Sequence, residues 1–183
     1  VIPLAFAVYL VPGLWGAPLK SISAFAPPLT TQDFNLYGGT FKEFHDYDEG
    51  MAYAEANRLP VIVDFSGYAW VNCRKMEGAV FDTPEVRSVI ENGYVLIKLM
   101  VDDKASLAQP FTVEEYGSPT VIETVGEKWS YLQRHKFGIN SQPYYMLLDN
   151  AGKPLMPART YDENVGKFVD WLNEGAAKYA EKR

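Results

Sequence analysis

Cysteine, histidine and positive charge are all scarce in this sequence of 183 residues. Its single cysteine, Cys73, excludes an intrachain disulfide and any zinc site built from several thiolates. The two histidines, His45 and His135, lie far apart without ligand-like spacing, so we expect no metal site and no cofactor. The net charge is −6 and the lysines are scattered, so the chain lacks the basic face of a nucleic-acid binder and we expect no nucleic-acid partner.

Charge is also missing from the start of the chain, where the first charged residue is Lys20. Residues 1–11 are almost wholly apolar, but a membrane span needs ~20 such residues and Pro and Gly follow at once. We interpret residues 1–20 as the end of a transmembrane helix and its exit from the membrane, 21–39 as a linker, and 40–183 as one globular domain. A signal-peptide remnant or a buried apolar arm is the alternative interpretation of the apolar segment.

The rest of the sequence alternates between strand-like and helix-like segments. We predict strands at residues 40–44, 61–65, 94–101, 144–149 and 153–157, and helices at 48–57, 73–80, 84–93, 127–136 and 162–179. Residues 102–126 are too long for an ordinary connection and are predicted to be an insertion, either a solvated loop or a docking surface for a partner. This order predicts an α/β fold with a central mixed β-sheet flanked by helices.

The strongest candidate for chemistry is the segment after the apolar strand at residues 61–65. Asp64 stands near the end of that strand, and buried carboxylates are rare without a partner or a task. Cys73 opens the next predicted helix and precedes Arg74 and Lys75, so the helix dipole and both cations predict a lowered thiol pKa. The alternative is that Cys73 is a small buried hydrophobic residue, as many lone cysteines are.

Several motifs, spread in order over essentially the whole chain, support a resemblance to one family. They are VPGLWGAPL at residues 11–19, DFSG at 64–67, VNCRKME at 71–77 and KWSYLQ at 128–133. Together they resemble the carboxyl-terminal periplasmic domain of the DsbD family, the thiol:disulfide interchange proteins also described as cytochrome c biogenesis transmembrane proteins. The resemblance implies a thioredoxin-like fold with a Cys-x-x-Cys motif between the central strand and its helix.

The resemblance assigns roles to four residues around this motif. Cys73 matches the second, resolving cysteine, whereas Trp70 stands where the first, attacking cysteine is expected. Asp64 matches the buried acid that shuttles protons, although a capped loop carboxylate is the alternative. Glu77 matches an acidic residue that tunes the site, although a solvated helix face is the alternative. Tryptophan cannot act as a nucleophile, and one thiol cannot store two electrons as a disulfide.

The resemblance also implies a substrate-binding edge. Gln142 and Pro143 resemble the cis-proline loop that holds the substrate strand, although a trans proline at a strand start is the alternative. Tyr68 and Tyr144 flank this expected groove, and with Trp70 and Tyr145 they are expected to form an aromatic patch.

The expected function is therefore a redox domain of an inner-membrane electron relay. By the resemblance, it takes electrons from the membrane-embedded domain of the same protein and passes them to periplasmic thiol/disulfide proteins, here impaired by loss of the attacking cysteine. One alternative is a non-catalytic thioredoxin-like module that binds an extended peptide by strand addition. A third hypothesis is a peroxidase-like or glutaredoxin-like enzyme that uses Cys73 alone.

Overall fold

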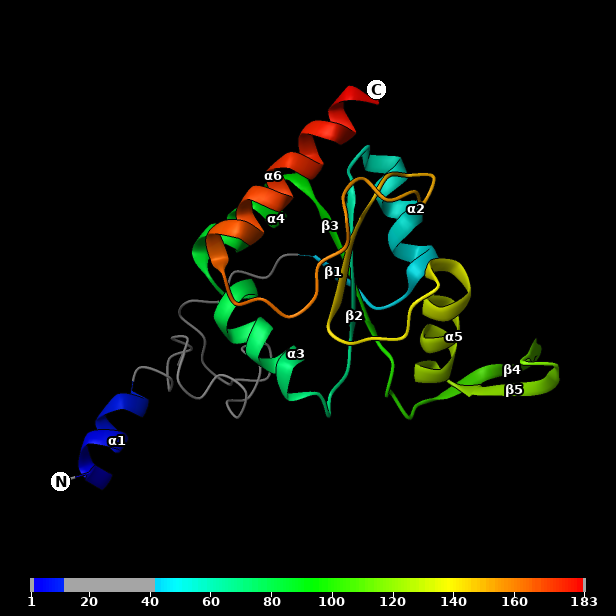
Figure 1. The fold of residues 1–183 in the computed structure, drawn as a ribbon, viewed down its shortest axis with the longest axis horizontal. Helices are drawn as coiled ribbons and strands as arrows, with labels where there is room; N and C mark the ends of the chain where they lie inside the picture. Colours follow the sequence, from blue (N-terminus) through cyan, green and yellow to red (C-terminus); the bar gives the residue numbers. More distant parts are fainter. Residues whose placement is uncertain (1, 12–41, 183) are drawn as a thin grey trace.

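The computed structural model describes residues 2–11 and 42–182 (Figure 1). In chain order its elements are α1 (Ile2–Leu10), β1 (Glu43–Phe44), α2 (Tyr47–Asn57), β2 (Val61–Ser66), α3 (Val71–Met76), the π-helix η4 (Glu77–Phe81), α4 (Pro84–Gly93), β3 (Val95–Met100), β4 (Ser106–Glu115), β5 (Ser118–Thr124), α5 (Val125–Phe137), β6 (Tyr144–Leu148) and α6 (Val165–Glu181). Within these two ranges, no helix combines the length and apolar character needed to cross a membrane. The predicted linker at 21–39, and residues 12–20 of the predicted membrane exit, lie outside the described residues.

Four strands form one mixed sheet in the order β1-β3-β2-β6. Strands β1, β3 and β2 run parallel, whereas β6 runs antiparallel to β2. Every residue of β2 is buried, as the continuous apolar run at 61–65 predicts for a central strand. Because β2 and β3 are parallel, their carboxyl ends meet at one edge of the sheet, and the loop before α3 leaves from that edge.

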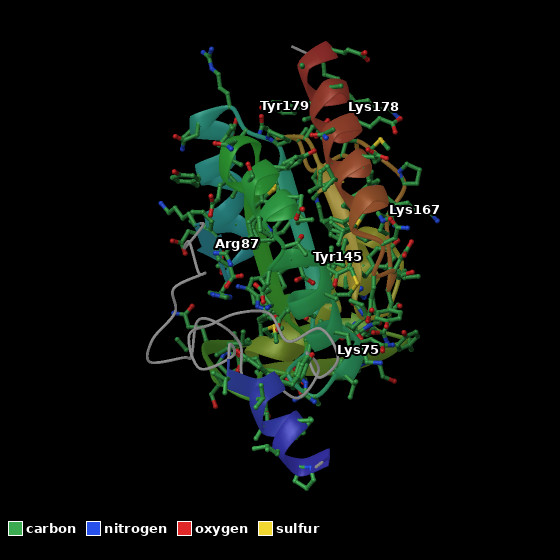
Figure 2. The ribbon with its side chains drawn as sticks, turned by 90° about the vertical axis from the view of Figure 1, so that its left-hand side faces the viewer. Lys75, Arg87, Tyr145, Lys167, Lys178 and Tyr179 are labelled. Atoms are coloured by element: carbon green, nitrogen blue, oxygen red, sulfur yellow. The ribbon has the colours of Figure 1, made fainter. Side chains whose placement is uncertain are left out.

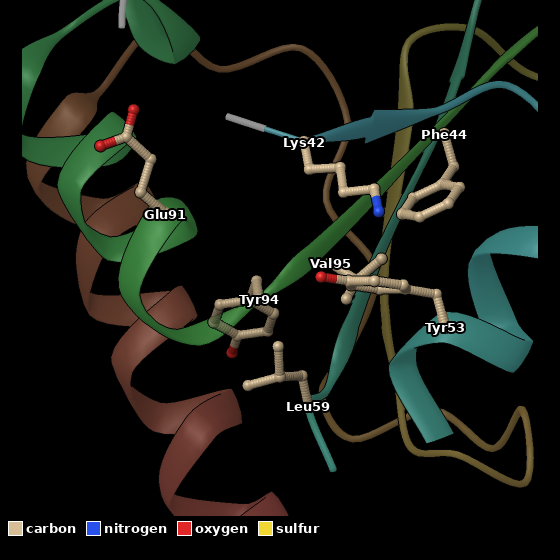
Figure 3. Close-up of a pocket in the computed structure, with 7 residues that line it drawn as sticks. All are labelled: Lys42, Phe44, Tyr53, Leu59, Glu91, Tyr94 and Val95. Atoms are coloured by element: carbon tan, nitrogen blue, oxygen red, sulfur yellow. The ribbon is translucent and has the colours of Figure 1, made fainter. Parts of the chain in front are cut away.

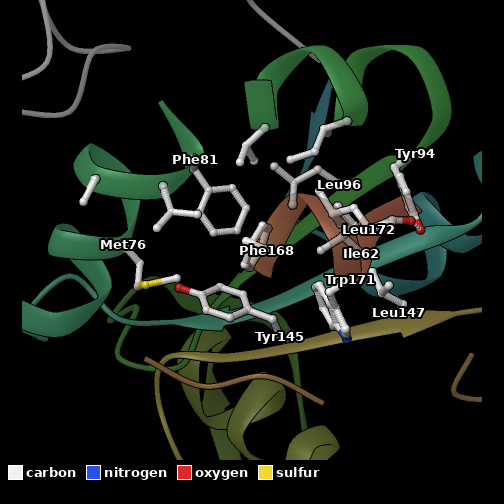
Figure 4. Close-up of a cluster of buried hydrophobic side chains, with 14 of the residues drawn as sticks. Ile62, Met76, Phe81, Tyr94, Leu96, Tyr145, Leu147, Phe168, Trp171 and Leu172 are labelled. Carbon is white, nitrogen blue, oxygen red and sulfur yellow. Dashed lines mark hydrogen bonds between the residues drawn. The ribbon is translucent and has the colours of Figure 1, made fainter. Parts of the chain in front are cut away.

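Helices cover both faces of this sheet. On one face α3, η4, α4 and α6 bury a core in which the ring of Phe81 lies 5.2 Å from the rings of both Tyr145 and Phe168 (Figure 4). On the other face α2 and α5 pack over Phe65 and its neighbours. Figure 2 shows Tyr145 inside the molecule, whereas Lys167 points outward from α6. The predicted flanked mixed sheet is therefore confirmed.

Local sequence explains where several helices begin and end. Thr124 accepts a hydrogen bond from the Glu127 amide, and the Glu127 carboxylate accepts one from the Thr124 amide, which forms a capping box at the start of α5. The same helix ends at Gly138, whose φ of 69° favours glycine. At α4, Thr83 is the N-cap residue by position only, because its hydroxyl donates to the Val80 carbonyl instead.

The prediction of a solvated loop at residues 102–126 is wrong in its secondary structure. Strands β4 and β5 pair antiparallel as a separate two-stranded sheet, which projects from the lower end of α5 in Figure 1. The turn between them has positive φ at Tyr116 (54°) and Gly117 (76°), as a two-residue type I′ turn requires. The hairpin is fixed to α5 because Arg134 donates two hydrogen bonds to the buried Glu115 carboxylate, at 2.6 and 2.9 Å.

The predicted return strand at residues 153–157 is also wrong as a regular strand. The predicted turn before it is present, with the Gly152 amide donating to the Asp149 carbonyl. After the turn, the chain makes only isolated bridges to β6, at Pro154 and Arg159. Prolines at 154 and 157 lack the amide donors that a continuous ladder requires.

Candidate functional site

The loop at residues 67–70 connects β2 to α3 and places Trp70 and Cys73 on either side of the helix start. Trp70 is the N-cap residue of α3, and its carbonyl accepts a hydrogen bond from the Arg74 amide. Trp70 is 38% exposed, whereas Cys73, in the first turn of the helix, is 2% exposed. The accessible position of this strand-loop-helix unit is therefore held by an indole, and the thiol lies beneath the surface.

Burial raises the pKa of the Cys73 thiol. Hydrogen bonds from the Ser66 hydroxyl and the Gly67 amide favour the thiolate, but the nearby Asp64 carboxyl disfavours it. The prediction of a lowered thiol pKa is therefore wrong. Desolvation inside the domain is the largest influence on this pKa, and Arg74 and Lys75 are not among the groups that shift it.

Asp64 lies in the middle of the sheet, beside Lys98 of β3 and Tyr145 of β6. Its side chain is on the same face as α3 and is 3% exposed, and its Oδ1 atom has no hydrogen-bond partner among the described residues. Burial raises its pKa from 3.8 to about 7, while the charge of Lys98 lowers it and that of Glu43 raises it. Asp64 is thus a buried strand residue and not a capped loop carboxylate.

Glu77 forms an ion pair with Lys98 beneath the helix. It is the first residue of η4, where α3 widens into a π-turn, and its side chain is only 24% exposed. Lys98 therefore lies between two carboxyl groups, those of Asp64 and Glu77. This arrangement does not fit a solvated helix face, and it puts all three ionisable groups on the face of the sheet that carries Cys73.

The loop before β6 has the isomer that the resemblance implies. The peptide bond between Gln142 and Pro143 is cis, and Pro143 is buried. The side-chain amide of Gln142 donates a hydrogen bond to the side-chain oxygen of Gln133. The side-chain nitrogen of Gln133 in turn donates to the Ser141 carbonyl at 2.9 Å. Gln133 is fully buried in α5, so the proline loop is tied to the interior of the domain.

The expected aromatic patch is only partly present. Tyr68 and Trp70 are exposed, but Tyr145 is 1% exposed and belongs to the core (Figure 4). Tyr144 packs against the opposite core, beneath α2 and α5. Alternation along β6 explains this result, because adjacent strand residues point to opposite faces. The surface patch therefore consists of Tyr68 and Trp70 in one loop.

Two residues that sequence reasoning missed hold this loop. Asp102 accepts hydrogen bonds from the amides of Tyr68 and Ala69, both at 2.9 Å. Gly67 lies under the indole, since a Cβ atom at this position would be 2.5 Å from the ring of Trp70. The sequence does contain a signal for Asp102: it follows β3 directly, and the parallel strands β2 and β3 end at the same edge of the sheet, next to the loop.

A pocket of about 260 Å³ lies at the other end of the parallel strands (Figure 3). Its wall includes Leu59, which precedes β2, and Val95, which begins β3. The Lys42 ammonium lies 3.9 Å from the ring centre of Tyr53, which also lines the pocket. None of the lining residues belongs to the Cys73 region, so the pocket is separate from the candidate site.

Comparisons with known proteins identify the fold. Residues 42–122 match the family model described as thioredoxin-like. No curated protein sequence matches the chain. A thioredoxin from Thermus thermophilus has a TM-score of 0.58 at 16% identity, covering 79% of this chain and 93% of that one. These matches confirm the predicted thioredoxin-like α/β fold.

Two further solved structures resemble the chain to a similar degree. A DsbH oxidoreductase has a TM-score of 0.56 at 14% identity, covering 80% of this chain and 92% of that one. The oxidised carboxyl-terminal domain of DsbD from Neisseria meningitidis has a TM-score of 0.52 at 14% identity, covering 73% and 99%. At these identities the likeness concerns the fold alone.

Proposed function

We propose that this is a redox-type domain of thiol:disulfide interchange, in which Trp70 replaces the attacking cysteine and impairs exchange. In a complete site, the exposed thiolate attacks one sulfur of a partner disulfide and expels the other sulfur as a thiolate. The second thiol loses its proton and attacks the mixed disulfide, so the domain leaves with an internal disulfide and the partner leaves as a dithiol. With Cys73 alone, the second step has no mixed disulfide to resolve.

The observation that carries this proposal is the contrast between positions 70 and 73. The buried sulfur of Cys73, with its raised pKa, suits a resolving thiol and is poorly suited to attack. The exposed position at the helix start suits an attacking thiol, and Trp70 occupies it. The buried Asp64 adds to the support for an exchange site.

The test is to restore the missing thiol. We expect Trp70→Cys to reduce insulin with dithiothreitol as the electron source, whereas the native chain shows little activity. Ala69→Cys is the matched control, because it adds a thiol to the same exposed loop with the wrong spacing to Cys73. A folded Trp70→Cys variant that stays as inactive as the native chain would show that this position is not what the site lacks.

We further propose the setting that the resemblance implies. The domain would lie in the periplasm, tethered to the inner membrane, and would exchange with the membrane-embedded domain of the same protein and with periplasmic thiol/disulfide proteins. Support comes from the VPGLWGAPL motif and the apolar residues before it. Thiol labelling of cysteines placed in the domain of the full-length protein, with a membrane-impermeant reagent applied to intact cells, tests this location. Labelling only after lysis would contradict it.

A second candidate is a non-catalytic thioredoxin-like module that binds an extended peptide. The burial of Cys73 favours it, because such a module needs no reactive thiol. Tyr68 and Trp70 would supply its exposed aromatic contacts. Rapid alkylation of native Cys73 by iodoacetamide at neutral pH would contradict it, whereas a slow reaction together with an inactive Trp70→Cys variant would favour it over the redox domain.

A further inference from the structure

The loop at residues 67–70 shields the thiol of Cys73. Its first residue, Gly67, is buried and hydrogen-bonded to Cys73 through the backbone amide, and the preceding Ser66 contributes its hydroxyl. Within the loop, the Trp70 amide donates to the Gly67 carbonyl at 3.3 Å. The next residues, Tyr68 and Ala69, are exposed, and the described structure gives their amides no hydrogen bond within the loop itself. The position of these two residues therefore depends on what their amides contact elsewhere.

Those contacts come from one carboxylate on the neighbouring strand connection. One oxygen of Asp102 accepts from the Tyr68 amide and the other accepts from the Ala69 amide, each at 2.9 Å. Hydrogen bonds to a charged acceptor are stronger than neutral ones, and two of them on adjacent amides fix both position and orientation.

Asp102 is itself held in a well-defined place. The Val101 amide donates to the Ser66 carbonyl at 2.9 Å, which extends the contact between the two parallel strands up to the loop. Just beyond, the Asp103 amide donates to the Met100 carbonyl, and the Asp103 carbonyl accepts from the Gly126 amide. The carboxylate thus projects from a tight turn that is anchored both to the sheet and to the start of α5.

We propose that Asp102 is a positioning residue, which holds the loop at 67–70 closed over Cys73 and presents Trp70 at the surface. The inference rests on the proposed function in taking this loop as the part of the site that meets a partner. Its physical content, the closure of the loop over the thiol, does not require any exchange activity.

The experiment measures the rate of Cys73 alkylation by iodoacetamide in the otherwise native chain. Loss of two charge-assisted hydrogen bonds in Asp102→Ala should raise this rate about ten- to a hundredfold by favouring the open loop. Hydrogen exchange at the amides of Tyr68 and Ala69, followed by NMR, should accelerate in parallel. The matched control is Asp103→Ala, which removes a carboxylate that accepts from the Ala105 amide in the same turn and for which the described structure shows no hydrogen bond to the loop amides.

Asp102→Asn keeps one acceptor oxygen and should give a rate between those of the native chain and Asp102→Ala. If Asp102→Ala does not fold, Asp102→Asn decides the question. The proposal is overturned if the folded Asp102 variants alkylate at the native rate, or if Asp103→Ala accelerates alkylation equally. These outcomes are independent of the insulin assay, so an inactive Trp70→Cys variant would refute the proposed function and leave this inference standing.

Discussion

Replacing Asp64 by asparagine should make the domain more stable at alkaline pH and leave its stability nearly unchanged near pH 4. Burial raises the pKa of Asp64 from 3.8 to about 7, against the opposing charge of Lys98. In the unfolded chain this carboxyl ionises near its usual pKa. Between about pH 4 and 7 the unfolded state therefore binds fewer protons than the folded state, and the stability of the native protein falls as the pH rises.

The size of this effect follows from the width of the pH window. At about 1.4 kcal/mol for each pH unit, the lost free energy of unfolding reaches about 4 kcal/mol above pH 7. Asparagine has a similar shape but cannot ionise, so Asp64→Asn removes this loss. Lys98 keeps its ion pair with Glu77 in the variant, so no cation is left without a partner.

Urea unfolding at a series of pH values, followed by circular dichroism, measures the difference between the two proteins. We expect the two stability curves to separate progressively between about pH 4 and 7 and to run parallel above that range. Asp170→Asn, at an exposed position of α6, serves as the control and should follow the native curve. Native and Asp64→Asn curves that stay parallel across the whole range would refute a raised pKa at Asp64.

Two further substitutions and one control variant test how the hairpin is attached. Gly126→Ala should lower the free energy of unfolding by about 1–3 kcal/mol in urea titrations, because its Cβ would lie 2.6 Å from the backbone nitrogen of Asp103. Gly93→Ala, with open space around the new methyl group, should be neutral or stabilising, and equal losses in both variants would contradict the steric argument. Arg134→Ala should leave the Glu115 carboxylate without its two donors and accelerate hydrogen exchange in β4 and β5. Unchanged hydrogen exchange in these strands would show that the hydrogen bonds from Arg134 to Glu115 do not hold the hairpin.

The main sheet could be predicted because its signals are local and strong. The apolar run at 61–65 is buried in β2, and the Tyr94–Val101 pattern gives β3 with small changes at the ends. The hairpin at 106–124 was harder to predict because its turn residues are Tyr116 and Gly117, where the usual signal is Asn-Gly or Asp-Gly. Pro110 and Pro119 also weaken the strand pattern.

The candidate site shows where sequence reasoning stops. Position along the chain predicted that Cys73 begins a helix, and it does lie in the first turn of α3. The thiol pKa depends on how deeply the helix packs and on what lies below it, and neither is visible in a local motif. The same is true of Asp102, whose contact with the amides of Tyr68 and Ala69 spans more than thirty residues of sequence.

The charges beneath α3 make position 73 a poor place for a nucleophilic thiolate. Lys98 already forms an ion pair with Glu77, so its positive charge is partly compensated and stabilises a further anion less. An ionised Asp64 and a Cys73 thiolate would both be buried near this pair. The charge of Asp64 raises the pKa of Cys73, and both groups raise the pKa of their neighbour Tyr145. A second negative charge is thus disfavoured there at neutral pH. A thiol that attacks a disulfide would therefore have to lie outside this buried group, and under the proposed function its place is the exposed helix start, which Trp70 occupies.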